Sequence, residues 1–88
     1  MNTVFFINDI VYSLQKLNIE ILIDTCAALD ISLQELREGL NKQNLKYIVY
    51  LIYYSIRDKK QLEIKDILKL DIETLDVLIG IYIEVNKG

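Results

Sequence analysis

The stretch Leu45-Lys-Tyr-Ile-Val-Tyr-Leu-Ile-Tyr-Tyr-Ser-Ile56 lies in the middle of the chain and contains its longest uncharged run, the ten residues from Tyr47 to Ile56. A helix that crosses a bilayer needs about 20 predominantly apolar residues. The run is therefore too short for a membrane span. With Asn44 as the N-cap, it predicts a helix of about residues 44–57 inside a globular domain.

This helix carries two apolar stripes when its residues are placed at helical spacing. The first stripe consists of Leu45, Ile48, Ile52 and Ile56. The second stripe consists of Tyr47, Tyr50, Leu51 and Tyr54. A polar edge of the helix consists of Lys46, Tyr53 and Arg57. One stripe is enough for the core of a small domain, so the second stripe is a candidate for a contact with another chain.

Two further helices are predicted on the N-terminal side. Ser32 and Glu35 have the spacing of a capping box, which starts a helix that Gly39 and Asn41 weaken at its end. Before it, Asn18 is a plausible N-cap for a helix of about residues 18–29. Its predicted apolar stripe is Ile19, Leu22, Ile23, Cys26, Ala27 and Asp30.

The segment Thr3–Leu14 consists of two β-branched and aromatic runs around Asn8-Asp9. Asn and Asp tolerate the left-handed backbone angles of a two-residue turn, so this pattern predicts a β-hairpin. The alternative interpretation is one amphipathic helix that continues to Leu17.

On the C-terminal side, a polar connection at residues 57–61 precedes a short apolar helix within Leu62–Leu70, and Asp71 can cap a last helix that runs to about Val85. One side of this last helix carries Leu75, Leu78, Ile79 and Tyr82, and another Val77, Ile81 and Val85. Its predicted solvent side carries Glu73, Asp76, Gly80 and Glu84.

The sequence thus predicts a mainly α fold, with an N-terminal β-hairpin followed by about five short helices in a single compact domain of residues 1–88. The hairpin occupies residues 1–15 and the helical part residues 18–86. A domain of this length buries only about 60–65% of the surface of its unfolded chain, so its stability is marginal without a partner.

Composition excludes several kinds of site. The chain has no histidine, so it lacks the side chain best suited to acid–base catalysis at neutral pH, and its one cysteine, Cys26, excludes an internal disulfide and a structural zinc site. The carboxylate pairs Glu35/Glu38, Glu63/Asp66 and Glu73/Asp76 have the spacing of solvated helix faces. We expect a protein that is not an enzyme, with no catalytic residue, no cofactor and no metal. The first nine residues lack the basic region of a signal peptide, so a cytoplasmic location is expected.

Hydrophobic residues make up 52% of the chain, which is high for this size. In one interpretation, both strongly apolar helices are central and are covered by the rest of the domain. In the other, one stripe contacts another chain, and tyrosine favours this because its ring buries a large area while its hydroxyl tolerates water. The predicted interface residues are Tyr47, Tyr50, Leu51, Tyr54, Val77, Ile81 and Val85, and we expect a homo-oligomer.

The formal net charge of the chain is −3, but the middle of the sequence is basic. Residues 42–69 contain seven basic and three acidic side chains, a local charge of +4, while both flanking segments are acidic. Pairing between the basic middle of one copy and the acidic ends of another would steer assembly. No aromatic and basic RNA-binding motif is present, so neither nucleic acid nor a membrane is an expected partner.

The order of these elements, together with Ile31-Ser-Leu-Gln-Glu-Leu-Arg-Glu-Gly-Leu40, resembles the small tail assembly chaperones of long-tailed bacteriophages and prophages. The resemblance covers about Phe6–Val85. Two positions depart from the family pattern. The turn has Asn8-Asp9 where Asn-Gly is common, and Asp30 stands where a glycine often precedes the Ile-Ser phrase.

The resemblance implies a viral assembly protein in the host cytoplasm. Its partner would be the long hydrophobic tape measure protein, which such chaperones coat and keep soluble until tail tube protein displaces them. An alternative of another class is a small acidic phage or mobile-element inhibitor that blocks a host nucleic-acid-binding enzyme by charge mimicry. Carboxylates gathered on one exposed face would indicate this second function.

Overall fold

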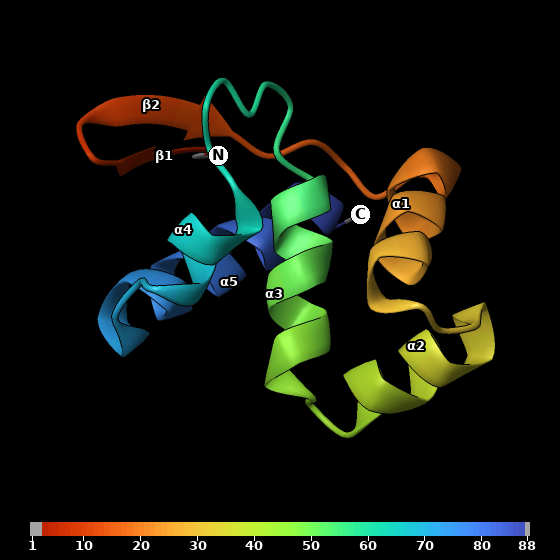
Figure 1. The fold of residues 1–88 in the computed structure, drawn as a ribbon. Coiled ribbons are helices and arrows are strands. Elements are labelled where there is room, and N and C mark those ends of the chain that lie inside the picture. Colours follow the sequence, from red (N-terminus) through yellow and green to blue (C-terminus); the bar gives the residue numbers. More distant parts are fainter. Residues whose placement is uncertain (1–2, 88) are drawn as a thin grey trace.

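The computed structural model describes residues 3–87, which form an N-terminal antiparallel hairpin followed by five α-helices (Figure 1). The elements are β1 (Val4–Ile7), β2 (Ile10–Ser13), α1 (Ile19–Leu29), α2 (Leu33–Asn41), α3 (Leu45–Tyr54), α4 (Ile64–Leu68) and α5 (Ile72–Asn86). The predicted fold class is confirmed. Residues 1 and 2 of the predicted hairpin segment, and residue 88 of the predicted domain, lie outside the described residues.

The N-terminal segment is a hairpin, and the alternative of one continuous helix is wrong. Asn8 and Asp9 form the two-residue turn with φ angles of 52° and 65°, as a type I′ turn requires. Phe5 then pairs with Tyr12 across the strands, with ring centroids 5.8 Å apart. Both rings lie on the face of the hairpin that packs into the core.

The four predicted side-chain N-caps at Asn18, Ser32, Asn44 and Asp71 are confirmed. In each, a side-chain oxygen accepts a hydrogen bond from the backbone N–H three residues later. At Ser32 the capping box is complete, because a carboxylate oxygen of Glu35 accepts from the Ser32 N–H at 3.1 Å. Helix starts were predictable because these contacts are local in sequence.

The helix predicted over residues 44–57 ends earlier, at Tyr54. Ile56 leaves the helix to form an isolated antiparallel bridge with Leu14, flanked by backbone hydrogen bonds from Gln15 N–H to the Ser55 carbonyl at 2.8 Å and from Arg57 N–H to the Ser13 carbonyl at 3.0 Å. This bridge fixes the hairpin to the end of α3. The helix predicted within 62–70 is likewise shorter, at Ile64–Leu68.

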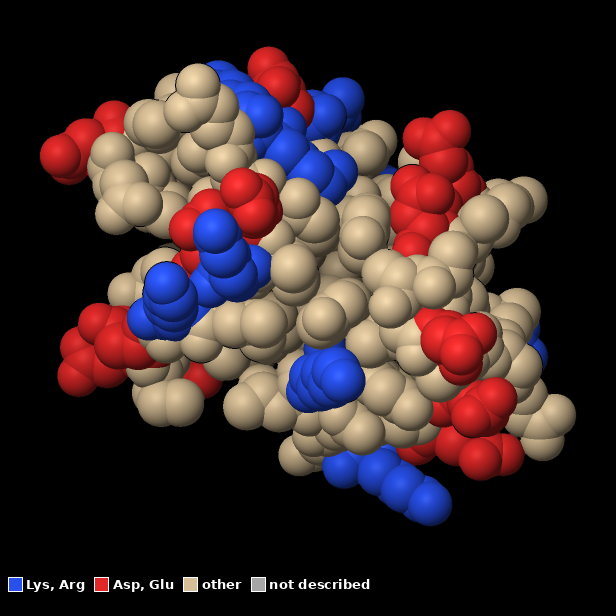
Figure 2. All heavy atoms as spheres, in the orientation of Figure 1, with Lys and Arg blue, Asp and Glu red and all other residues tan. Residues whose placement is uncertain are grey.

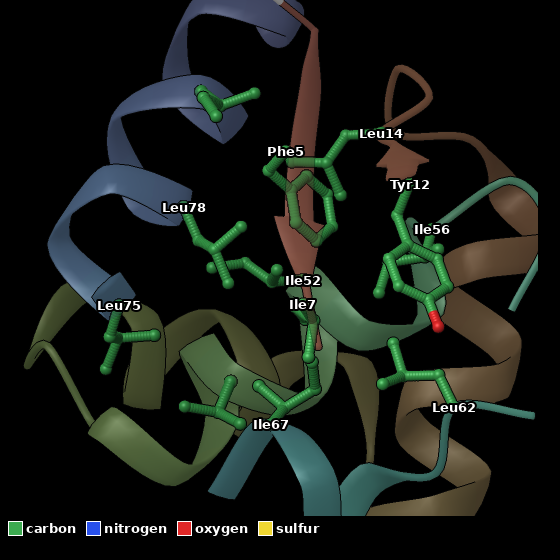
Figure 3. Close-up of a cluster of buried hydrophobic side chains, with 12 residues drawn as sticks. Phe5, Ile7, Tyr12, Leu14, Ile52, Ile56, Leu62, Ile67, Leu75 and Leu78 are labelled. Carbon is green, nitrogen blue, oxygen red and sulfur yellow. The ribbon is translucent and has the colours of Figure 1, made fainter. Parts of the chain in front are cut away.

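Helix α3 is central, with α1 and α2 on one side and α4 and α5 on the other (Figure 1). Side chains from the hairpin, α3, α4 and α5 meet in the main hydrophobic cluster (Figure 3). This cluster consists of Phe5, Ile7, Tyr12, Leu14, Val49, Ile52, Ile56, Leu62, Ile67, Leu75, Leu78 and Ile81. The interpretation in which both strongly apolar helices pack centrally therefore holds for much of their surface.

The first predicted stripe of the central helix needs correction. Ile52 and Ile56 are buried as expected, but Leu45 is 50% exposed and Val49 is buried in its place. Tyr53, predicted at the polar edge, is half-buried, and its hydroxyl donates to the Leu62 carbonyl at 3.0 Å. Because neighbours pack around α3 on several sides, its buried surface is wider than one stripe.

The predicted apolar stripe of α1 lies on the wrong side of the helix. The residues buried against the rest of the chain are Ile21 and Thr25, while Ile19 and Ile23 are 74% and 61% exposed. Thr25 is tolerated inside because its hydroxyl donates to the Ile21 carbonyl at 2.7 Å. Four of the first five residues of α1 are apolar, so either side of the helix could have faced the core.

The solvent side of α5 is as predicted, since Glu73, Asp76, Gly80 and Glu84 are all exposed. Leu75 and Leu78 are buried on the predicted core side, with Ile79 and Tyr82 packed against the core. No helix within residues 3–87 has the length and apolar character needed to cross a membrane.

Candidate protein-binding surfaces

The domain leaves many large apolar side chains in contact with solvent. Within residues 3–87, fifteen hydrophobic residues are buried, while thirteen large ones are exposed. The exposed ones are Val4, Phe6, Ile10, Val11, Leu17, Ile19, Ile23, Leu33, Leu45, Leu68, Ile72, Val77 and Ile83. Single exposed apolar residues are normal on protein surfaces, so the grouping of these residues decides whether they form a binding surface.

The predicted tyrosine stripe of α3 is only partly a surface. Tyr47, Tyr50 and Tyr54 are half-buried, but Leu51 is 4% exposed. Leu51 is therefore a core residue and offers almost no area to a partner, so its assignment to the interface is wrong. The cause is the packing of α1 and α2 on this side of α3.

Two of the three tyrosines already have contacts within the chain. The ring of Tyr47 occupies the space beside Gly39 that a Cβ atom would need. Tyr54 contacts Tyr53 edge to face, with centroids 5.0 Å apart, and the Lys59 ammonium lies 5.6 Å from the Tyr54 ring centroid. Of the stripe, Tyr50 lines a groove that remains open.

The predicted stripe of α5 is divided in the same way. Val77 is 60% exposed and Val85 is half-buried, but Ile81 is 8% exposed and belongs to the core cluster. Ile81 is therefore mainly a core residue and offers a partner little area, and its assignment to the interface stays a prediction. The hairpin packs near this part of α5 and covers it, which a helical projection of α5 alone does not show.

The first apolar groove, here called the α3–α4 groove, has a volume of about 480 Å³. Its lining residues are Leu45, Lys46, Val49, Tyr50, Ile67, Leu68, Leu70, Ile72 and Leu75. The Lys46 ammonium lies 6.0 Å from the Tyr50 ring centroid, so one cation stands at an otherwise apolar wall. This is the geometry of a groove for an apolar segment with polar edges.

The second groove, here called the hairpin groove, lies between the hairpin and α5 and has a volume of about 390 Å³. It is lined by Val4, Phe5, Phe6, Thr74, Val77, Leu78 and Ile81. Phe6 is 66% exposed and pairs across the strands with Val11, which is also exposed. The hairpin is therefore apolar on both faces, with only its inner face in the core.

A third groove, here called the α3–α5 groove, has a volume of about 340 Å³. It is lined by Leu17, Leu40, Ile48, Leu51, Ile52, Ile79, Tyr82 and Ile83. Leu17 is fixed at its edge because its N–H donates to the Asn86 side-chain oxygen at 2.7 Å. The three grooves lie at different junctions between elements, so the apolar surface is distributed over the molecule.

Charged side chains are mixed over the face seen in Figure 2, with acidic groups near α1 and α2 and lysines near α4 and the start of α3. Within the described residues, the one ion pair joins Lys65 and Glu63 at 3.6 Å. Helix α1 contains Glu20 and Asp24 and has no basic residue. These unpaired charges are available to a partner.

Part of the basic middle is used inside the chain. The Lys60 ammonium donates to the Val11 carbonyl at 2.8 Å and lies 5.1 Å from the Tyr12 ring centroid. The Lys59 ammonium donates to the Ile56 carbonyl at 3.3 Å. These lysines fasten the loop after α3 to the hairpin and to α3, so they contribute less to a partner surface than their sequence positions indicate.

Two of the three carboxylate pairs contain a residue that caps a helix. Glu35 belongs to the capping box of α2, and Asp66 accepts a hydrogen bond from the Glu63 N–H at 2.8 Å. Hydrogen bonds from Thr74 lower the pKa of Asp71, the cap of α5. No group of three metal-ligating side chains occurs in the described part of the chain, and Cys26 is a half-exposed free thiol.

Two tyrosines have altered acidity because of packing. Burial is the largest cause of the raised pKa of Tyr53, and the neighbouring Tyr54, Glu63 and Asp66 raise it further. Burial also raises the pKa of Tyr82, and a hydrogen bond with Ser55 partly offsets this. Both hydroxyls therefore keep their protons at neutral pH and act as packing and hydrogen-bonding groups.

Comparison with known proteins gives no match: no family model, curated protein or solved structure is similar to this chain. By its fold, the protein is a small, mainly helical domain with an N-terminal hairpin.

Several surface residues were missed from the sequence. Helical spacing places Ile19, Ile23 and Leu45 on apolar stripes, and the strand pattern places Phe6 in the hairpin; all four are exposed in the structure. A signal existed for α1, because apolar residues occupy both of its faces. No comparable signal marks Leu68 and Ile72, which line the α3–α4 groove only because α4 and α5 pack beside α3.

Proposed function

We propose that this chain is a non-catalytic tail assembly chaperone of a long-tailed bacteriophage or prophage. It self-associates and binds the hydrophobic tape measure protein, keeping that protein soluble until tail tube protein replaces it. The sequence resemblance names the role. The structural observation that supports it is the set of apolar grooves and thirteen exposed hydrophobic side chains on a domain of this size.

Grooves of this kind suit the recognition of amphipathic helices, which insert apolar side chains at helical spacing between two walls. The hairpin groove is our candidate for the tape measure protein, because Phe6 and Val77 are both largely exposed at its walls. Burying the exposed parts of these two side chains against a partner supplies about 2–4 kcal/mol of hydrophobic free energy. That is a substantial contribution to binding for a small domain.

The test is co-expression of this chain with an apolar helical fragment of a tape measure protein, followed by measurement of the soluble fraction of the fragment. The wild-type chain should keep the fragment soluble, and the double variant Phe6→Asp with Val77→Asp should lose most of this effect. Leu33→Asp is the matched control, because Leu33 is exposed on α2 and lines none of the three grooves. Equal precipitation with and without the wild-type chain would refute the proposal.

The alternative of a charge-mimicking inhibitor has less support. It requires carboxylates gathered on one face, whereas acidic side chains lie at several separate places in Figure 2 with lysines between them. Several carboxylates are also engaged in helix caps. On the face seen in Figure 2, the distribution of charge therefore favours the chaperone over the inhibitor.

A further inference from the structure

The outward side of α1 is a convex, apolar and acidic ridge. Ile19, Ile23 and Ala27 are exposed and follow one another at i, i+4 and i+8, while Glu20 and Asp24 are exposed on the adjacent row. Ile19 and Ile23 are 74% and 61% exposed, which is unusual for two neighbouring isoleucines of one helix. This set of five residues is called the α1 ridge below.

No other element of the described chain covers the α1 ridge. Helix α1 packs on α3 through its opposite side, where Ile21 and Thr25 are buried. Glu20 and Asp24 form no ion pair within residues 3–87. The ridge therefore presents both apolar area and unsatisfied negative charge to solvent.

The α3–α4 groove has the opposite shape and the opposite charge at one wall. Leu45, Leu68 and Ile72 at its walls are 50%, 54% and 66% exposed, so they are available to inserted side chains. Lys46 lines the groove, and Lys69 follows Leu68 at its edge; neither forms an ion pair within the described residues.

Acidic groups near the start of α5 must also be counted. Asp71 and Glu73 lie beside Ile72. The Asp71 carboxylate is held by the Thr74 N–H at 2.7 Å as the cap of α5. Glu73 is exposed and forms no ion pair within the described residues, so an acidic ridge would be positioned toward Lys46 on the α3 wall of the groove.

The ridge cannot fill the groove of its own chain. Helices α1 and α4 lie on opposite sides of α3 (Figure 1). A second copy, however, carries the same ridge on a helix of 11 residues, about 16 Å long, which is shorter than any dimension of the domain. Apolar side chains would then meet apolar walls, and carboxylates would meet lysines.

We propose that the α1 ridge of one copy docks into the α3–α4 groove of a second copy. This inference deepens the self-association in the proposed function and rests on it. The contact is heterologous, because two different surfaces of the same chain meet, so each added copy leaves one ridge and one groove free. Association continues head to tail until a ring closes or a filament forms.

A single three-turn helix buries an area at the small end of specific interfaces, so the association is weak and depends on concentration. We expect wild-type protein to sediment as monomer at low micromolar concentration and as larger species at several hundred micromolar. Sedimentation velocity over this range measures the effect directly.

Two variants, one for each surface, test the head-to-tail geometry. Ile23→Glu places a charge in the apolar part of the α1 ridge, and Leu68→Glu places one at a wall of the α3–α4 groove. Each variant should weaken self-association at least tenfold. Both positions are exposed, so the fold should persist, as circular dichroism would verify. Leu33→Glu is the matched control and should associate like the wild type.

Mixing the two variants gives the sharpest result. One intact ridge and one intact groove remain in such a mixture, so a 1:1 complex of twice the 10.3 kDa chain mass should form and grow no further. A mixture that stays monomeric, an Ile23→Glu variant that associates like the wild type, or a wild-type chain that is monomeric throughout would each overturn the inference.

A charge exchange provides an independent check. Lys46→Glu with Lys69→Glu should abolish association, and so should Glu20→Lys with Asp24→Lys, while combining all four changes in one chain should restore it. If the fourfold variant stays monomeric although both double variants are folded, charge pairing between these surfaces is refuted.

The tape measure experiment separates this inference from the proposed function. If the wild-type chain self-associates and Ile23→Glu is monomeric, yet the wild-type chain fails to keep the fragment soluble, the head-to-tail contact stands and the chaperone function fails. If the wild-type chain keeps the fragment soluble but shows no self-association, the chaperone function stands and the contact fails.

Discussion

At the scale of single residues, Gly39 and Gly80 lie in helices but in opposite surroundings. A Cβ atom at Gly39 would overlap the Tyr47 ring, whereas at Gly80 it would meet nothing within 4 Å. Gly39→Ala should therefore destabilise the protein by about 1–3 kcal/mol through overpacking. Gly80→Ala should stabilise it by about 0.5–1 kcal/mol, because alanine is the better helix former. Urea denaturation followed by circular dichroism measures both changes.

We attribute the expected loss of stability of Gly39→Ala to overlap with the Tyr47 ring, and a double variant checks this. Adding Tyr47→Ala to Gly39→Ala removes the overlap, so the two changes should cost less together than the sum of their separate effects. Strict additivity of the two free energies would contradict a direct contact between these positions.

Asp71 gives a prediction about pH. Its pKa is lowered by hydrogen bonds from Thr74 in the folded chain, so the ionised form is bound more favourably there than in the unfolded chain. The resulting stabilisation is complete above the ordinary aspartate pKa of about 3.9 and is lost as the pH falls through the lower folded-state value.

Asp71→Asn keeps an N-cap oxygen that does not titrate, and so provides the comparison. The stability of the wild type relative to this variant should be constant from pH 5 to 7 and should fall below about pH 4. Denaturation midpoints measured across this range provide the check, and a constant difference down to pH 2 would contradict the assignment.

At the scale of secondary-structure elements, the hairpin turn holds two non-glycine residues at positive φ. Asp9 has a φ of 65°, a region that costs most L-residues free energy but glycine almost none. Asp9→Gly should stabilise the domain by about 0.5–1 kcal/mol, the gain being limited by the greater freedom of glycine in the unfolded chain. The Asp9→Gly variant should have a higher thermal unfolding midpoint than the wild type. Asp9→Ala relieves no strain, so its midpoint should not rise.

The element scale also shows what the sequence could predict. The caps at Asn18, Ser32, Asn44 and Asp71 were predictable because each depends on residues three positions apart. The end of α3 was not, because Ile56 leaves the helix to pair with Leu14, more than 40 residues earlier. Local chemistry starts these helices, whereas distant contacts end one of them.

The same distinction explains the errors on the candidate surfaces. Ile23 and Ile21 are equally apolar neighbours on α1, so helical periodicity alone could not decide which would face α3. Ile81 was assigned to a surface because the hairpin that covers it is distant in sequence. The presence of excess apolar area was predictable from composition, but the location of that area required the packed structure.

At the scale of the whole molecule, one side chain links parts of the chain that are far apart in sequence. The Asn86 oxygen accepts from the Leu17 N–H at 2.7 Å, and its amide donates to the Tyr82 carbonyl at 2.9 Å. The amide thus fastens the end of α5 to the segment that leads into α1.

Asn86→Ala removes both hydrogen bonds and should cost about 1–2 kcal/mol of unfolding free energy. Amide hydrogen exchange should accelerate first at Leu17 and in the last turn of α5, while the amides of α3 should change only by the global loss of stability. Uniform acceleration at all amides would show that Asn86 acts on the whole fold and not as a local clamp.

The scarcity of ion pairs has a further consequence. Lys65 and Glu63 form the only pair within residues 3–87, and both are exposed, so the fold derives little stability from attraction between opposite charges. Raising the ionic strength should leave the unfolding temperature almost unchanged while it screens the charges that guide one molecule toward another. A simple change of buffer would then dissociate an assembly whose subunits remain folded.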